Sequence, residues 1–113
     1  MGQVASMTTA QYNKARLRHQ EELDRGVVTG ARMDRYSGRL VIEWSNLPEM
    51  ILDPRMIEGL ESANPKELTD VEVVSEGMYL YFPRIDKIIY AMPLRDGIYG
   101  SKAWMKAHAG LLL

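Results

Sequence analysis

The sequence predicts an α+β fold: a small single domain with an antiparallel sheet of two β-hairpins plus an extra strand. Helices are expected on one side of the sheet and at both termini. Two observations predict this class. Segments in which apolar and polar residues alternate, as they do in β-strands, follow one another through the middle of the chain. Helix-capping signals lie near both ends. Consecutive strands joined by short turns are typical of antiparallel pairing.

The first helix is predicted to begin after Thr8, whose spacing to Gln11 is that of a capping box, and to be stopped by Gly26. Its apolar stripe is narrower than that of a helix packed on a core. We therefore expect a peripheral helix, which either lies loosely on the sheet or reaches for a partner. On this basis residues 1–26 form a flexible start and a peripheral N-terminal helix, and residues 27–113 form the α+β domain with the C-terminal helix.

The first hairpin is predicted to join the strands Val27–Tyr36 and Arg39–Ser45. In its second strand Leu40, Ile42 and Trp44 alternate with residues that face the other way. This alternation indicates a hairpin with one buried face.

The second hairpin is predicted around a turn at Gly77. In the strand that follows, Leu80 and Phe82 point to one face of the sheet, and Tyr79 and Tyr81 point to the other. The first pair is therefore expected in the core, and the two tyrosines are expected on the outer face.

Shorter elements complete the fold. Met50–Leu52 is predicted as a brief strand, and Lys87–Ala91 as a final strand. Asp53 followed by Pro54 has the pattern of a helix N-terminus, and this helix is predicted to end near Ala63. Ser101 is predicted to cap the last helix.

Composition excludes several functions. The 113 residues include no cysteine, which rules out disulfides, thiolate metal sites and a cysteine nucleophile. Neither of the two histidines, His19 and His108, has a second histidine at helical spacing, and no serine-hydrolase or phosphate-loop motif is present. We therefore expect no enzyme, no cofactor and no metal. No apolar run approaches the ~20 residues of a membrane helix, so a cytoplasmic protein without membrane contact is expected.

The outer sheet face is the main candidate for an interaction surface. Tyr79 and Tyr81, together with Val74 and Val41, are predicted to form an apolar face. If the first helix covered this face it would be core, but the narrow stripe of that helix favours incomplete cover. Aromatic residues in a partly uncovered patch are typical of protein–protein anchors. The three terminal leucines, Leu111–Leu113, are expected to pack on this domain or on a second copy.

A nucleic-acid interface is the alternative. Lys14, Arg16 and Arg18 cluster on the first helix, and outward tyrosines on a strand beside basic residues are the arrangement of single-strand RNA readers. The acidic residues that follow on the same helix neutralise this cluster, and the net charge of the chain is -1. A protein that contacts phosphates usually carries a basic excess. Nucleic-acid binding is therefore possible but not favoured.

The segment from Gly59 to Met105 has a distinctive order of residues. Its characteristic positions are Gly59, Leu60, Glu67, Leu68, Val71, Glu72, Gly77, Leu80, Pro83, Asp86, Gly100, Ser101, Trp104 and Met105. At these positions the chain resembles a small bacterial family, domain of unknown function 2442, and the similarity extends upstream through the hairpin at Tyr36 to Leu40. The resemblance implies a compact α+β unit and no established activity. Genes of this family often lie beside small toxin-like reading frames, which implies an antitoxin-like or accessory role.

The leading hypothesis from the sequence is a non-catalytic protein-binding module, with a nucleic-acid-binding regulator as the alternative. The module is expected to cover a functional surface of a protein partner, or of a second copy of itself. Tyr79 and Tyr81 are the predicted contact residues, and Arg84 and Trp104 are included in the same predicted site.

Overall fold

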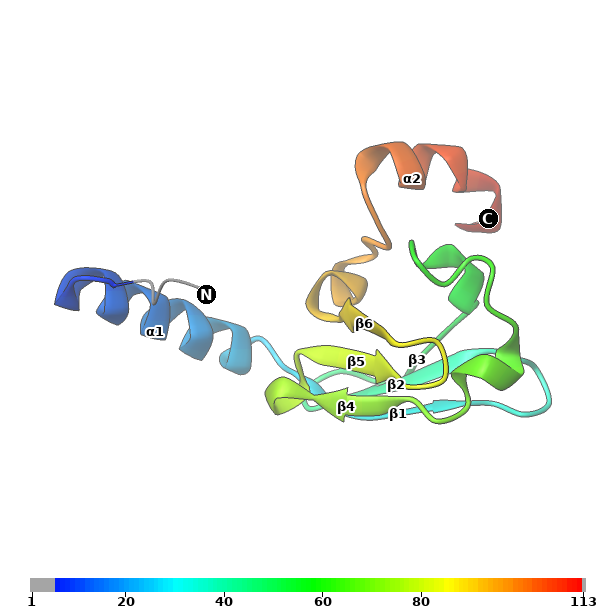
Figure 1. The fold of residues 1–113 in the computed structure, drawn as a ribbon, viewed down its shortest axis with the longest axis horizontal. Coiled ribbons are helices and arrows are strands. Elements are labelled where there is room, and N and C mark those ends of the chain that lie inside the picture. The colour runs from blue at the N-terminus through cyan, green and yellow to red at the C-terminus, as the bar shows by residue number, and fades with distance from the viewer. Residues whose placement is uncertain (1–5, 113) are drawn as a thin grey trace.

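The structure, a computed structural model, describes residues 6–112, the last two of them by their backbone only. It confirms the predicted α+β class and divides the strands between two three-stranded antiparallel sheets (Figure 1). The first sheet consists of β1 (Val28–Met33), β2 (Leu40–Trp44) and β3 (Met50–Leu52), in that order. The second consists of β4 (Glu72–Val74), β5 (Tyr79–Phe82) and β6 (Lys87–Tyr90), again in that order. Each predicted hairpin is thus extended by its own third strand.

Two α-helices and several 3₁₀ turns connect and flank the sheets. The α-helices are α1 (Thr9–Asp24) and α2 (Lys102–Ala107). The 3₁₀ turns are η1 (Pro54–Met56), η2 (Pro65–Leu68), η3 (Ser75–Gly77), η4 (Met92–Asp96) and η5 (Ala109–Leu112). Neither α1 nor any other described helix has the length and apolar character that a membrane crossing requires.

The predicted start and end of α1 are confirmed. The Thr8 hydroxyl accepts a hydrogen bond from the Gln11 N–H at 3.1 Å, and the Gln11 side chain accepts one from the Thr8 N–H at 2.8 Å. These two bonds form the capping box and satisfy two N–H groups that a helix otherwise leaves without partners. Gly26 follows with a φ of 101°, a conformation that favours glycine and ends the helix.

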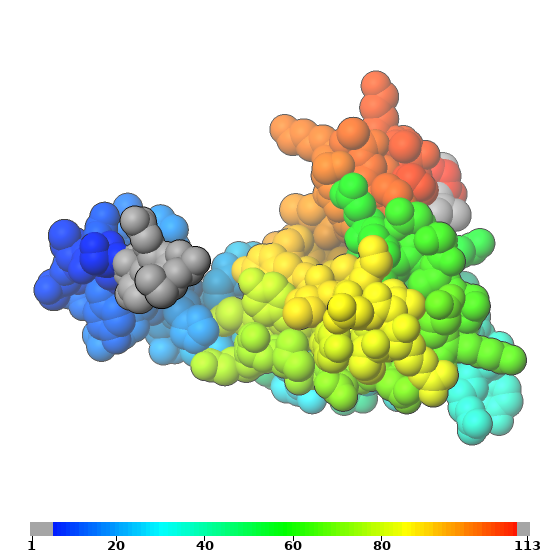
Figure 2. Space-filling model, in the orientation of Figure 1, coloured from blue at the N-terminus to red at the C-terminus, as the bar shows by residue number. Residues whose placement is uncertain are grey.

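α1 covers neither sheet and projects from the body of the molecule (Figures 1 and 2). None of its residues is buried. Its C-terminal half is held to the body by polar contacts: His19 with Glu76 (3.1 Å), Arg25 with Asp96 (3.1 Å) and Glu22 with Arg95 (3.5 Å). The expectation that this helix is peripheral is therefore confirmed. Residues 1–5 of the predicted flexible start lie outside the described residues, as do the side chains of Leu111–Leu113, whose packing was predicted.

The helix predicted to run to Ala63 is wrong. Its start is present, because the Asp53 carboxylate accepts a hydrogen bond from the Arg55 N–H at 2.9 Å. Only the 3₁₀ turn η1 follows. Ile57 then adopts an extended conformation and is buried in the core, and Gly59 reverses the chain with a φ of 101°. The local helix signal is thus overridden by the surrounding structure after a single turn.

The core lies between the two sheets and the turns that connect them. Leu40 and Ile42 from β2, and Leu80 and Phe82 from β5, are fully buried, as their alternation predicted. Other turns and connections add to the same cluster: Ile57, Leu60, Leu68, Met92 and Leu94.

Val41 was predicted to belong to an exposed apolar face, and this is wrong, since its exposed fraction is only 2%. Val41 is not part of the main core cluster, so it does face away from Leu40 and Ile42. It lies between its cross-strand partners Arg32 and Ile51, whose long side chains flank it. Residues directly opposite in neighbouring strands are close enough to cover one another. Val41 therefore does not belong to an exposed apolar face.

Candidate partner-binding face and cleft

The second sheet carries an exposed aromatic surface. Its register places Val74 opposite Tyr79, and Tyr79 opposite Tyr90 on the other side; Tyr81 lies opposite Ile88. Directly opposite residues share a face of the sheet. We call this surface the tyrosine face and define it as Val74, Tyr79, Tyr81, Ile88 and Tyr90. Ile88 is 62% exposed and Tyr90 43%, so large apolar side chains face solvent here.

The tyrosines of this face are held in place by neighbours. The rings of Tyr79 and Tyr90 pack at 5.0 Å between centroids, tilted by 43°, which is a favourable aromatic arrangement. The Tyr81 hydroxyl donates a hydrogen bond of 3.5 Å to the Asp86 carboxylate. Partial burial, and then the negative charge of Glu22, raise the pKa of the Tyr90 phenol above its ordinary value. Tyr90 is therefore neutral at physiological pH and presents a hydroxyl that can donate or accept.

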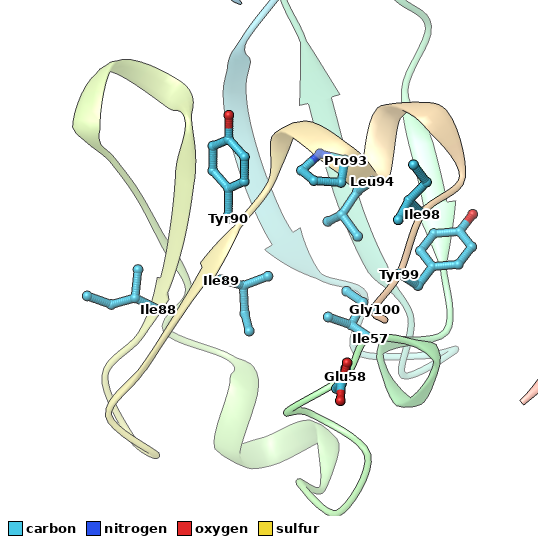
Figure 3. A pocket seen from close by; sticks show the side chains of 10 residues that line it. All are labelled: Ile57, Glu58, Ile88, Ile89, Tyr90, Pro93, Leu94, Ile98, Tyr99 and Gly100. Atoms are coloured by element: carbon cyan, nitrogen blue, oxygen red, sulfur yellow. The ribbon is translucent and has the colours of Figure 1, made fainter. Parts of the chain in front are cut away.

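A cleft of about 310 Å³ lies beside the tyrosine face, along β6 (Figure 3). One side of it is formed by Ile88, Ile89 and Tyr90 of β6. The opposite side is formed by Ile57–Glu58 and by residues between Pro93 and Gly100. Most of the lining is apolar, and Glu58 is the charged residue among the lining side chains. The cleft and the tyrosine face share Ile88 and Tyr90, so they form one continuous surface.

Arg84 lies in the turn between β5 and β6. Its guanidinium donates to the Asp70 carboxylate at 2.7 Å and to the Lys66 carbonyl at 3.2 Å. The ion pair is exposed, so it contributes little to stability but occupies the Arg84 side chain.

Trp104 lies on α2, and its side chain makes contacts within the protein. Its indole N–H donates to the Met56 carbonyl at 2.7 Å, and its ring stacks on His108 at 3.5 Å between centroids. These contacts anchor α2 to the segment that follows β3. Of the four predicted site residues, the structure brings Tyr79 and Tyr81 together on one face, while Arg84 and Trp104 lie outside the tyrosine face.

Sequence reasoning missed Ile88 and Tyr90 as members of the site. Their alternation with Ile89 was visible, but it does not show which strand β6 pairs with. Only the pairing of β6 with β5 places these two residues beside the tyrosines.

The remaining polar groups form no evident reaction centre in the described part of the chain. His19 is paired with Glu76, and His108 is stacked on Trp104. Residues 6–112 contain no group of three or more histidine or carboxylate side chains that could hold a metal ion. What the geometry offers is an apolar, aromatic surface with a cleft, which is suited to binding.

Comparison with solved structures shows the family of the chain. A crystal structure of a protein of unknown function from Rhodospirillum rubrum matches with 34% sequence identity and a TM-score of 0.64. The match covers 71% of this chain and 96% of that one. The chain belongs to the same family as the Rhodospirillum protein. No protein-family model and no curated protein matches the chain. The resemblance to domain of unknown function 2442 therefore stays a prediction.

A second structure shares the fold. It is the solution structure of an uncharacterized protein from Chromobacterium violaceum, with 20% identity and a TM-score of 0.68. The match covers 94% of this chain and 96% of that one. At this identity the similarity shows the fold alone. The Rhodospirillum protein is described as having unknown function and the Chromobacterium protein as uncharacterized.

Proposed function

We propose that this protein is a non-catalytic protein-binding module, which uses the tyrosine face to cover a functional surface of its partner. The observation that carries the proposal is a sheet face with exposed Tyr79, Tyr90 and Ile88 beside the half-buried Tyr81, left uncovered by α1. Tyrosines are enriched among the residues that dominate binding energy at protein interfaces. The packed Tyr79–Tyr90 pair supports this role, because rigid aromatic side chains lose little entropy on binding.

Charge favours a protein partner over nucleic acid at this face. Glu72 lies opposite Tyr81 on the same side of the sheet, and Glu58 lines the adjacent cleft. Both carboxylates would repel phosphates. The nucleic-acid alternative is based on a cluster of basic residues that lies elsewhere, on the projecting α1: Lys14, Arg16 and Arg18. The family resemblance adds a class of partner to test first, a small toxin-like protein.

The tyrosine double variant carries both Tyr79→Ala and Tyr81→Ala. Loss of two interface anchors, each worth about 2 kcal/mol or more, is expected to weaken partner binding by at least about 100-fold. Stability is expected to fall by only about 1 kcal/mol, chiefly from the lost Tyr79–Tyr90 contact. The partner is isolated with tagged protein from cells of the source organism and identified by mass spectrometry. Its affinity for wild type and variant is then measured by calorimetry.

Tyr36→Ala is the matched control, because this tyrosine is fully exposed on the β1–β2 connection. It is expected to bind the partner as wild type does. Unchanged binding by the double variant would show that the tyrosine face is not the site. Recovery of nucleic acid, with an affinity that falls steeply as salt rises, would replace the protein-binding proposal by the nucleic-acid regulator.

A further inference from the structure

β6 is an edge strand whose outer backbone groups have no partner strand. Tyr90 lies opposite Tyr79, and the Ala91 N–H continues the pairing by donating to the Met78 carbonyl at 2.8 Å. In an antiparallel pair, alternate residues direct their N–H and C=O toward the neighbouring strand. Ala91, Ile89 and Lys87 therefore bond toward β5. The N–H and C=O of Ile88 and Tyr90 point away from it, and no described turn or loop bonds to them.

The cleft adjoins this free edge. Ile88, Ile89 and Tyr90 line it from β6, and the wall from Pro93 to Gly100 bounds it on the other side (Figure 3). Figure 3 shows Ile89 on the same side of β6 as Leu94 and Ile57, whose buried side chains underlie the cleft. We call the free edge of β6 together with this cleft the β6 slot.

The chemistry of the β6 slot specifies its occupant. An unpaired strand edge is a template for another strand, because it offers donors and acceptors at the strand repeat. A segment paired with it alternates its side chains between the cleft and the tyrosine face. The cleft is apolar and its charged side chain, Glu58, is an acid. Cleft-facing positions of the segment are therefore apolar, and acidic residues there are disfavoured.

We propose that the β6 slot binds an extended peptide segment of the partner, as a fourth strand on β6, with apolar side chains of that segment in the cleft. This inference rests on the proposed function and states how the partner is held. The outward N–H and C=O groups of Ile88 and Tyr90 supply the backbone hydrogen bonds. Side chains on the other face of the segment extend the tyrosine face beside Ile88 and Tyr90.

The first test uses peptides. A phage-displayed library of random octapeptides is selected against the full chain, and the best binder is synthesised with a single N-methyl group at each position in turn. Methylation removes an N–H donor. Alternate positions are expected to lose at least about tenfold in affinity and the positions between them little, since every second amide faces β6. Absence of any binding peptide, or a methylation profile without this period of two, would overturn the inference.

The second test uses Ile98→Asp, which places a charge on the cleft wall. Ile98 is 50% exposed, and Ile51, the matched control, is 54% exposed on β3, an edge strand of the other sheet. Ile98→Asp is expected to weaken the selected peptide by about tenfold or more, because it puts an acid into an apolar site. Ile51→Asp is expected to bind it normally, and both proteins are expected to melt near the wild-type temperature. Equal binding by the two variants would contradict the β6 slot.

Binding of the natural partner to the two variants distinguishes this inference from the proposed function. Loss of partner binding in both Ile98→Asp and the tyrosine double variant supports the two together. Loss in the tyrosine variant alone overturns the β6 slot and leaves the tyrosine face in place. Loss in Ile98→Asp alone overturns the tyrosine face and leaves the β6 slot. A wild-type dimer that Ile98→Asp dissociates would make a second copy the occupant and would overturn the peptide proposal.

Discussion

Gly77→Ala is expected to lower the free energy of unfolding by about 2–5 kcal/mol. Two costs add up: alanine is strained in the left-handed backbone conformation of this position, and its methyl group overpacks the contact with the neighbouring strand. Gly77 is buried, with a φ of 86°, in the turn between β4 and β5. A Cβ at this position would collide with the Val28 carbonyl oxygen, and it would lie 3.0 Å from the Val27 Cβ. The two sheets meet here, so neither backbone can move without disturbing the other. Urea unfolding followed by circular dichroism measures the loss.

Gly97→Ala is the matched control for this effect. Gly97 has a similar φ of 78°, but nothing lies within 4 Å of the position that a Cβ would take. Its substitution is expected to cost only the backbone term, about 1 kcal/mol. The difference between the two variants therefore isolates the contact of Gly77 with β1. Equal losses at both positions would mean that β1 and η3 adjust at little cost, and that this junction of the sheets is not tightly packed.

Local signals in the sequence were sufficient where the structure depends on local bonds. The spacing of Thr8 and Gln11 fixes the start of α1, because both capping bonds lie within one helical turn. Alternation predicted the buried residues of β2 and β5 for a similar reason: the face on which a side chain lies follows from its position along the strand. The helix predicted after Asp53 was wrong beyond its first turn, because a capping signal marks where a helix starts and does not show where the chain leaves the helical conformation, which it does at Ile57.

The sequence did not predict which strands pair when they are distant in the chain. Two hairpins were expected to share one sheet, but β3 pairs with β2 and β6 pairs with β5. Periodicity shows that a strand has a buried face and does not name its neighbour. For the same reason, the sequence did not predict the part of the site that lies on β6. Tyr79 was predicted to face outward, but Tyr90 could join it only once the register of β6 was known. The cleft depends on three separate segments and had no signal in the sequence.

One of the contacts that attach α1 is made by Arg95, a cation whose side chain is largely covered. The side chain of Arg95 is only 6% exposed, which is unusual for a charged residue. Its guanidinium donates to the Gly26 carbonyl at 2.5 Å and lies 3.5 Å from the Glu22 carboxylate. It also lies 6.0 Å from the centre of the Trp44 ring, within the range of a cation–π contact. Arg95 thus joins the end of α1 to the core of the first sheet.

Arg95→Ala is expected to destabilise the protein by about 2–3 kcal/mol, because it removes a charge-assisted hydrogen bond and leaves Glu22 without its buried partner. Arg25→Ala, the control, removes an arginine that is 52% exposed and is expected to cost at most about 1 kcal/mol.

Limited trypsin digestion at Arg16 and Arg18 should be faster in Arg95→Ala than in Arg25→Ala. Equal digestion rates in the two variants would mean that Arg95 contributes no more than the exposed ion pairs do to keeping α1 attached to the body of the protein. A faster rate in Arg95→Ala with unchanged partner binding would place α1 outside the interface, whereas a loss of both would make the orientation of α1 part of the binding surface.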